Sequence, residues 1–116
     1  MKSEHRDVIR HYIRAKDENR PELMERAFTG SATLSMELQT QNIDFPSLTD
    51  GREAITEVLV RDFSRNYENV HTFCLEDSVK VEGDRLSCDW LVVMSTKNGG
   101  DIRVGCGSYR WQFNAL

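Results

Sequence analysis

Apolar residues recur at helical spacing in the first part of the chain. From Glu4 to Lys16 they fall every three or four positions, which predicts an amphipathic helix. The predicted buried face of this helix consists of Val8, Ile9, Tyr12 and Ile13. A second, short helix is expected from Pro21, because proline suits the first turn of a helix, and it ends at Thr29-Gly30-Ser31.

The middle of the chain predicts one strand, a loop and the longest helix. Apolar residues alternate from Ala32 to Leu38, as in a half-buried strand. The segment from Thr40 to Asp50 is polar, contains Pro46 and predicts a loop. Helical spacing then returns from Arg52 to Tyr67.

After Asn69 the apolar pattern changes to a period of two. It predicts three strands, at about Val70–Glu82, Arg85–Lys97 and Asp101–Phe113. The turns between them contain the Gly and Asn residues that hairpins need. Helices followed by consecutive antiparallel strands indicate the α+β class, with one domain over residues 1–116.

The strand that begins near Val70 has two faces of different character. His71 alternates with Phe73 and Leu75, so we expect these three side chains to face the interior together. The opposite, wetter face is expected to hold Thr72, Cys74, Glu76, Ser78 and Lys80.

Composition and charge limit the classes of function. The chain has 116 residues, of which 39% are hydrophobic and 29% charged, enough for one packed core. Its net charge of −4 and its lack of a basic run argue against a nucleic-acid partner. No stretch approaches the roughly 18 apolar residues of a membrane span, and the polar start lacks a signal peptide's apolar core. We therefore expect a cytoplasmic protein without a membrane partner.

Cysteine and histidine spacing gives no metal motif. Cys74, Cys88 and Cys106 lie far apart in apolar runs, which predicts reduced, buried thiols rather than disulfides or a zinc site. His5 and His11 are six positions apart and would point to different faces of a helix, so they cannot share a metal ion.

Four segments carry a family resemblance through their order and spacing. They are residues 16–23 after the first helix, 51–55 at the start of the long helix, 69–72 at the start of the sheet, and 105–110 in the last strand. Together they resemble the nuclear transport factor 2-like superfamily, in particular its SnoaL-like branch. The resemblance implies a cone-shaped α+β barrel, in which N-terminal helices pack on a strongly curved, mainly antiparallel sheet around an apolar cavity. Members usually end with one more strand, which we expect to be missing here.

The resemblance also implies a candidate site. In the superfamily's dehydratases, scytalone dehydratase among them, a cavity-facing His pairs with an Asp at the end of the first helix, and His71 and Asp17 match these by position. Such a carboxylate would fix the imidazole tautomer and leave the other ring nitrogen as a general base. The second cavity His of the dehydratases is absent, with Cys106 and Ser108 near that position. A satisfied strand His and a solvated turn Asp remain the alternative interpretation.

The remaining candidates are one hydroxyl donor and a set of cavity-lining residues. Tyr12 would donate a hydrogen bond to a substrate oxygen, or would be a core residue with its hydroxyl bonded. The expected binding residues are apolar, or thiol, side chains that would otherwise be ordinary core: Met36, Phe63, Phe73, Trp90 and Cys106.

Two functional hypotheses follow. The first is a cofactor-independent isomerase, dehydratase or cyclase that acts by proton transfer on an apolar cyclic small molecule. The second is a non-catalytic ligand-binding or dimerisation module of the same fold. By family analogy we expect a homodimer formed through the sheet.

Overall fold

The computed structural model describes residues 2–37 and 45–113, and it has helices first and a large antiparallel sheet after them. Its elements, in order, are α1 (Lys2–Asp17), the 3₁₀ helix η1 (Pro21–Arg26), β1 (Thr33–Ser35), β2 (Leu48–Asp50), α2 (Arg52–Thr56), the π-helix η2 (Glu57–Asp62), α3 (Phe63–Asn66), β3 (Tyr67–Cys74), the 3₁₀ helix η3 (Glu76–Ser78), β4 (Lys80–Glu82), β5 (Arg85–Thr96) and β6 (Ile102–Gln112). This order confirms the predicted α+β class.

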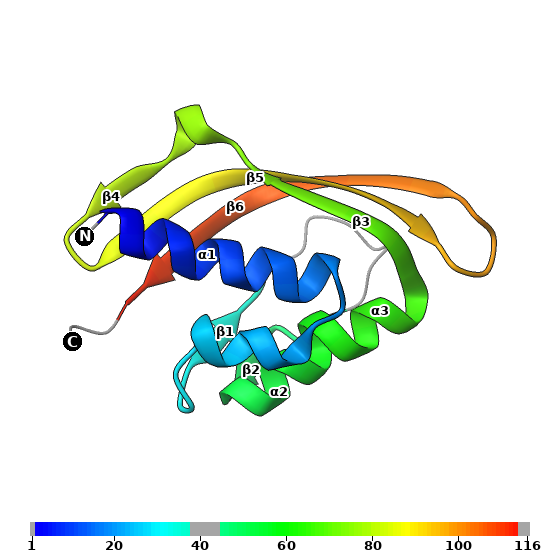
Figure 1. Cartoon of the computed structure of the whole chain (residues 1–116), viewed down its shortest axis with the longest axis horizontal. Coiled ribbons are helices and arrows are strands. Elements are labelled where there is room, and N and C mark those ends of the chain that lie inside the picture. The colour runs from blue at the N-terminus through cyan, green and yellow to red at the C-terminus, as the bar shows by residue number, and fades with distance from the viewer. Residues whose placement is uncertain (1, 38–44, 114–116) are drawn as a thin grey trace.

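The large sheet is organised around β5. Strands β3 and β4 pair with one edge of β5 and β6 pairs with the other, all antiparallel. Figure 1 shows this sheet curving over α1, with the labelled helices on its concave side. β1 and β2 form a separate two-stranded sheet below α1. The arrangement agrees with the predicted cone, in which a twisted sheet folds over a helical layer.

The concave face of the sheet carries the core. On β5 the buried side chains are Leu86, Cys88, Val92 and Met94, with Trp90 partly buried between them. Leu86 and Cys88 cluster with Ile9 of α1, and Val92 and Met94 cluster with Phe63 of α3. A further cluster among the helices buries Tyr12, Ala15, Met24, Ile55, Leu59 and Val60. β6 contributes Tyr109 and Trp111 to the same layer. Burial of this apolar surface supplies the main stabilising term of the fold.

The predicted strand Val70–Glu82 is broken in two. β3 ends at Cys74, η3 follows, and β4 starts at Lys80. The Ser78 hydroxyl donates to the carbonyl of Leu75 and accepts from the amide of Asp89. These local bonds give the backbone an alternative to the sheet ladder, so the strand turns here. Pro21–Arg26 is likewise a 3₁₀ helix rather than an α-helix, and the predicted end of the first strand, Leu38, lies outside the described residues.

A bulge in β3 sets which side chains face the core. Glu68 pairs with Ser95 and His71 pairs with Val93, so three steps along β3 match two along β5. Asn69, inside this irregularity, has a φ of 52°. Beyond it Val70 and Thr72 are buried while His71 and Phe73 are exposed. The predicted facing of this strand is therefore wrong, because both faces carry apolar residues and a bulge shifts the alternation.

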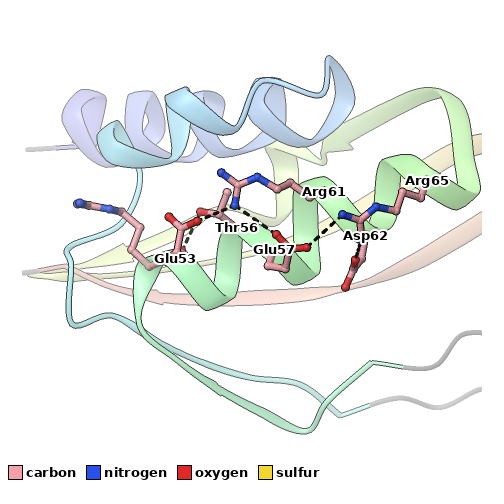
Figure 2. Close-up of polar contacts among 7 residues, drawn as sticks. Glu53, Thr56, Glu57, Arg61, Asp62 and Arg65 are labelled. Atoms are coloured by element: carbon pink, nitrogen blue, oxygen red, sulfur yellow. Dashed lines mark hydrogen bonds and ion pairs between the residues drawn. The ribbon is translucent and has the colours of Figure 1, made fainter.

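The predicted long helix is confirmed, but its middle is a π-helix. α2, η2 and α3 run without a break from Arg52 to Asn66. Figure 2 shows charged side chains that bridge the turns of this helix. The Arg61 guanidinium lies 2.7 Å from Glu53 and 3.3 Å from Glu57. Arg65 contacts Glu57 and Asp62. Such exposed pairs contribute little to stability, because solvent screens the charges. The helix is held mainly by its opposite, apolar face, where Ile55, Leu59, Val60 and Phe63 are buried.

Candidate functional site

The last turns of α1 bring polar groups under the concave face of the sheet. Tyr12 and Lys16 are one turn apart and therefore share a face of the helix. Both are buried, with exposed fractions of 5% and 7%. Asp17, the final residue of α1, is half-buried beside them.

Asp17 is bonded to the sheet through both of its carboxylate oxygens. Oδ2 accepts a hydrogen bond from the backbone amide of Thr72 at 2.7 Å, and Oδ1 accepts one from the Thr72 hydroxyl at 2.7 Å. Burial raises the pKa of Asp17 above 3.8, against the opposing effects of the Thr72 bonds and of the charges on Lys16 and His71. The carboxyl group is thus held firmly in a partly desolvated position.

The predicted Asp17–His71 pair is not formed. His71 is exposed on the convex face of the sheet, whereas both hydrogen bonds of Asp17 go to Thr72, its neighbour on the concave face. His71, the residue matched by position in the sequence, comes directly before Thr72, the residue that Asp17 contacts. The cause is the orientation of β3 after its bulge.

Lys16 was not among the candidates from the sequence, although it is the most unusual group here. Its Nζ lies 5.2 Å from the ring centre of Phe63, 5.9 Å from that of Trp90 and 6.0 Å from that of Tyr12. Among the side chains of residues 5–37 and 45–113, no carboxylate lies within 4.0 Å of it. Burial lowers the pKa of Lys16 from 10.5, and the nearby charge of Asp17 opposes this shift. The available signal was its position one turn beyond Tyr12 on the apolar face of the helix.

Two tyrosines form a hydroxyl pair next to this lysine. Tyr12 and Tyr109 are hydrogen-bonded through their side chains, and their rings meet edge to face at 5.9 Å. Burial raises the pKa of Tyr12 to about 12 and also raises that of Tyr109. Both therefore stay protonated near neutral pH and can donate hydrogen bonds. This position agrees with the second interpretation given from the sequence, a core residue with its hydroxyl bonded, and donation to a substrate stays a prediction.

The predicted binding residues divide between the two faces of the sheet. Met36, Phe63 and Trp90 lie on the concave side, in contact with the core. Phe73, 52% exposed, and Cys106 lie on the convex side, so these two are wrong as cavity residues. The exposure of Cys106 also contradicts the expectation of a buried thiol, whereas Cys88 is buried with its Sγ 2.9 Å from that of Cys74.

Hollows in the described surface lie away from this cluster. One is lined by Leu75, Glu76, Asp77 and Ser78. Another, of about 270 Å³, is lined by Asn19, Arg61, Ser64, Arg65 and Lys97. Neither is lined by Tyr12, Lys16, Asp17 or Trp90. We call the group formed by Tyr12, Lys16, Asp17 and Tyr109 the concave cluster.

The convex face of the sheet carries an apolar area that we call the outer patch. Register places Phe73 beside Leu91 and Leu91 beside Cys106, and it places Val93 beside Val104. Ile102 and Val104 are 74% and 66% exposed. The outer patch consists of Phe73, Leu75, Leu91, Val93, Ile102, Val104 and Cys106.

Taken together, the concave cluster contains a carboxyl group with a raised pKa, an amine with a lowered pKa and two phenolic donors. Titratable groups whose pKa values are shifted by desolvation inside an aromatic region are typical of sites that transfer protons. Hydroxyl donors beside them can stabilise charge that develops on a substrate oxygen.

Comparison with known proteins gives a family and several structural relatives. The model of the SnoaL-like domain family matches residues 2–115. TsrD from Streptomyces laurentii superposes with a TM-score of 0.75 at 12% identity, over 98% of this chain and 81% of that one. A protein from Mesorhizobium loti, provisionally named a SnoaL-like polyketide cyclase, gives 0.65 at 15% identity, over 97% and 88%.

A third relative, an NTF2-like protein of unknown function from Exiguobacterium, gives a TM-score of 0.66 at 16% identity over 93% of this chain and 87% of that one. At these identities the structural matches establish the cone fold alone. A search of curated proteins found no match. Among the described helices, none is both long enough and apolar enough to span a bilayer.

Proposed function

The chain belongs to the SnoaL-like domain family, and from that premise we propose that it is a small-molecule enzyme that moves a proton on an apolar cyclic substrate. Isomerisation, dehydration and cyclisation all fit this description. The name polyketide cyclase given to the Mesorhizobium loti protein is consistent with the last of these.

One observation carries the proposal: the Asp17 carboxylate is fixed by two 2.7 Å hydrogen bonds at the edge of an aromatic interior. A fixed carboxylate whose pKa is raised by desolvation is a better general base than a solvated one. In this proposal Asp17 takes the proton, in place of His71. The Tyr12–Tyr109 hydroxyl pair donates to the substrate oxygen on which charge develops.

Base-catalysed ring opening of nitrobenzisoxazole tests this role without knowledge of the natural substrate. A base removes the carbon-bound proton, the N–O bond breaks, and a coloured cyanophenolate is released. We expect Asp17→Asn to lower the rate about a hundredfold or more, the size of a typical general-base contribution. The wild-type rate should rise with pH through the raised pKa of Asp17 and then level off, because the ionised form is the base.

The matched control is Glu18→Gln, which makes the same chemical change at the neighbouring, exposed position. His71→Asn is the second control, since its imidazole lies on the convex face. Both should retain the wild-type rate. Equal rates for Asp17→Asn and the wild type would overturn the assignment of Asp17 as the base, and a large loss in His71→Asn would restore the His71 hypothesis.

The alternative function, a non-catalytic ligand-binding or dimerisation module, is favoured by the outer patch. Its exposed Phe73, Ile102 and Val104 form a contiguous apolar surface of the kind that marks an association site. We propose that two copies associate through this patch. The dimer face would then be the face of the sheet that carries His71. It would not be the face predicted to hold Thr72 and every second residue up to Lys80, because Thr72 faces the core.

A further inference from the structure

The amine of Lys16 is buried among aromatic rings without an ionic partner. A charged side chain removed from water is normally paired, because desolvating an ammonium group costs several kcal/mol. Here the rings of Phe63, Trp90 and Tyr12 surround Nζ at 5.2–6.0 Å, and no carboxylate of the described chain lies within 4.0 Å. Cation–π attraction recovers only about 0.5–2 kcal/mol for such a group. The arrangement therefore favours the neutral amine.

The nitrogen also remains accessible. No hydrogen bond reaches Lys16 Nζ within the described residues. The fully covered side-chain atoms without a partner in that region are His5 Nδ1 and Thr49 Oγ1, and Lys16 Nζ is not one of them. The nitrogen must therefore keep some contact with solvent.

Groups suited to the proton transfers of carbonyl–amine chemistry lie around this nitrogen. Asp17 is the next residue along the helix, and its carboxylate acts on Lys16 through its charge. The Tyr12 ring lies within cation–π distance of Nζ, and its hydroxyl is bonded to that of Tyr109. A carboxylate, a phenol pair and an amine in one aromatic region are the components that an imine-forming site requires.

We propose that Lys16 is a nucleophile that forms an imine with apolar aldehydes or ketones. The lone pair of Nζ attacks the carbonyl carbon, a C–N bond forms, and the carbonyl oxygen takes up a proton donated within the Tyr12–Tyr109 pair. Nζ loses a proton to Asp17, and Asp17 returns this proton to the new hydroxyl group as the C–O bond breaks and water leaves. A protonated imine remains, and a proton from solvent restores the phenol. Overall, one carbonyl compound, one neutral amine and one proton give one iminium and one water. Apolar carbonyl compounds are specified because the surrounding side chains are aromatic.

This chemistry goes beyond the proposed proton transfer at Asp17, since it adds a covalent intermediate. An iminium carbon is a stronger electron sink than a carbonyl carbon, so it would acidify the adjacent C–H bond. The two proposals can stand or fall separately, because covalent trapping at Lys16 requires no turnover.

Reductive trapping tests the inference. The full-length chain is incubated with benzaldehyde and sodium cyanoborohydride at neutral pH, which converts an imine into a stable benzylamine, and each lysine peptide is quantified by mass spectrometry. The chain provides internal references in Lys80 and Lys97, which are both exposed. We expect Lys16 to be labelled several times faster than either, because its buried amine has a lowered pKa and is neutral in a larger fraction of the molecules.

Variants separate reactivity from loss of structure. Lys97→Arg removes an exposed amine and should leave labelling of Lys16 unchanged. Circular dichroism of Lys16→Met, which keeps the length of the side chain, checks that the fold does not need the amine. Labelling of Lys16 no faster than that of Lys80 and Lys97 in the folded wild type would overturn the proposal.

Discussion

The side chain of Asp17 connects the helix to the sheet, and its partial burial there raises its pKa. Its carboxylate accepts from both the amide and the hydroxyl of Thr72. An asparagine could accept from the same amide through its oxygen and donate to the same hydroxyl through its nitrogen. An alanine could do neither. Substitutions at this position therefore separate the effect of the charge from the effect of the hydrogen bonds.

The first prediction concerns stability against pH. The pKa of Asp17 is raised above 3.8 on folding, so its contribution to stability is greatest below about pH 3.8 and is lost as pH rises through the folded value. The variant Asp17→Asn has no carboxyl group at this position, so it does not lose stability in this way as pH rises. The free energy of unfolding of Asp17→Asn minus that of the wild type should therefore increase between pH 3.8 and neutrality, as measured by urea denaturation.

Asp17→Ala supplies the comparison for that experiment. It should be less stable than Asp17→Asn by about 1–3 kcal/mol at every pH, because the Thr72 amide loses its acceptor and the Thr72 hydroxyl loses its hydrogen-bond partner. A difference between Asp17→Asn and the wild type that does not change with pH would show that the pKa of Asp17 is not raised.

Sequence reasoning identified part of the site at this scale. Tyr12 and Asp17, both chosen from the sequence, lie in one cluster in the structure, whereas their catalytic roles stay predictions. Lys16 was missed because a lysine near a helix C-terminus has an ordinary explanation in the helix dipole. His71 was placed on the wrong face because an inserted residue reverses the alternation of a strand, and Asn69 gives no reliable sign of such a bulge in the sequence.

At the scale of elements, β6 contains two glycines, and the lack of a side chain at these positions leaves room for the Trp90 ring against the sheet. The ideal Cβ of an alanine at Gly107 would lie 2.7 Å from the Trp90 ring, whereas one at Gly105 would lie 3.2 Å from a Val92 methyl group. The indole of Trp90 thus rests directly on the backbone of Gly107. This close approach holds Trp90 under the sheet and beside Lys16.

The second prediction follows from this contact. Gly107→Ala should destabilise the fold by about 1–3 kcal/mol, the usual cost of overpacking, because the rigid indole must move. Gly105→Ala is the matched control, and its cost should be smaller because its contact is looser. Thermal melts measure both, and tryptophan fluorescence should change in Gly107→Ala. A Gly107→Ala protein as stable as Gly105→Ala would contradict the packing described.

The elements themselves were predictable wherever the apolar period was sustained. The first helix, the long helix and strands β5 and β6 agree with their predicted ranges within a few residues. The break at η3 was not predicted, because its cause is a local bond network around Ser78 rather than a change of period. The π-helical turn was also not predicted, since the buried positions from Ile55 to Phe63 keep an ordinary helical spacing.

At the scale of the whole molecule, the two faces of the sheet have different environments. Helices cover the concave face (Figure 1). The convex face carries the outer patch. The predicted cone followed from the order of the elements and from the family resemblance. The distribution of residues between the faces required the structure, because Phe73, Val93 and Val104 are as apolar as many core residues.

The third prediction is that the outer patch mediates self-association. Val104→Asp places a charge at the centre of the proposed contact and should shift the protein from dimer to monomer, as measured by analytical ultracentrifugation. Gln112→Asp adds the same charge to an exposed position at the end of β6, outside the patch, and should leave the dimer intact. A wild-type protein that is monomeric at micromolar concentration would contradict the proposal.

The wide turn η2 has one more consequence, which concerns helical phase. A π-helical turn contains about one residue more than an α-helical turn, and each residue of an α-helix advances the side chain by about 100° around the axis. Removing one residue between Glu57 and Asp62 would rotate everything that follows, and Phe63 would no longer face Val70 and Met94. The length of this turn therefore determines the direction in which the chain enters β3, and through β3 it determines where Thr72 meets the end of α1.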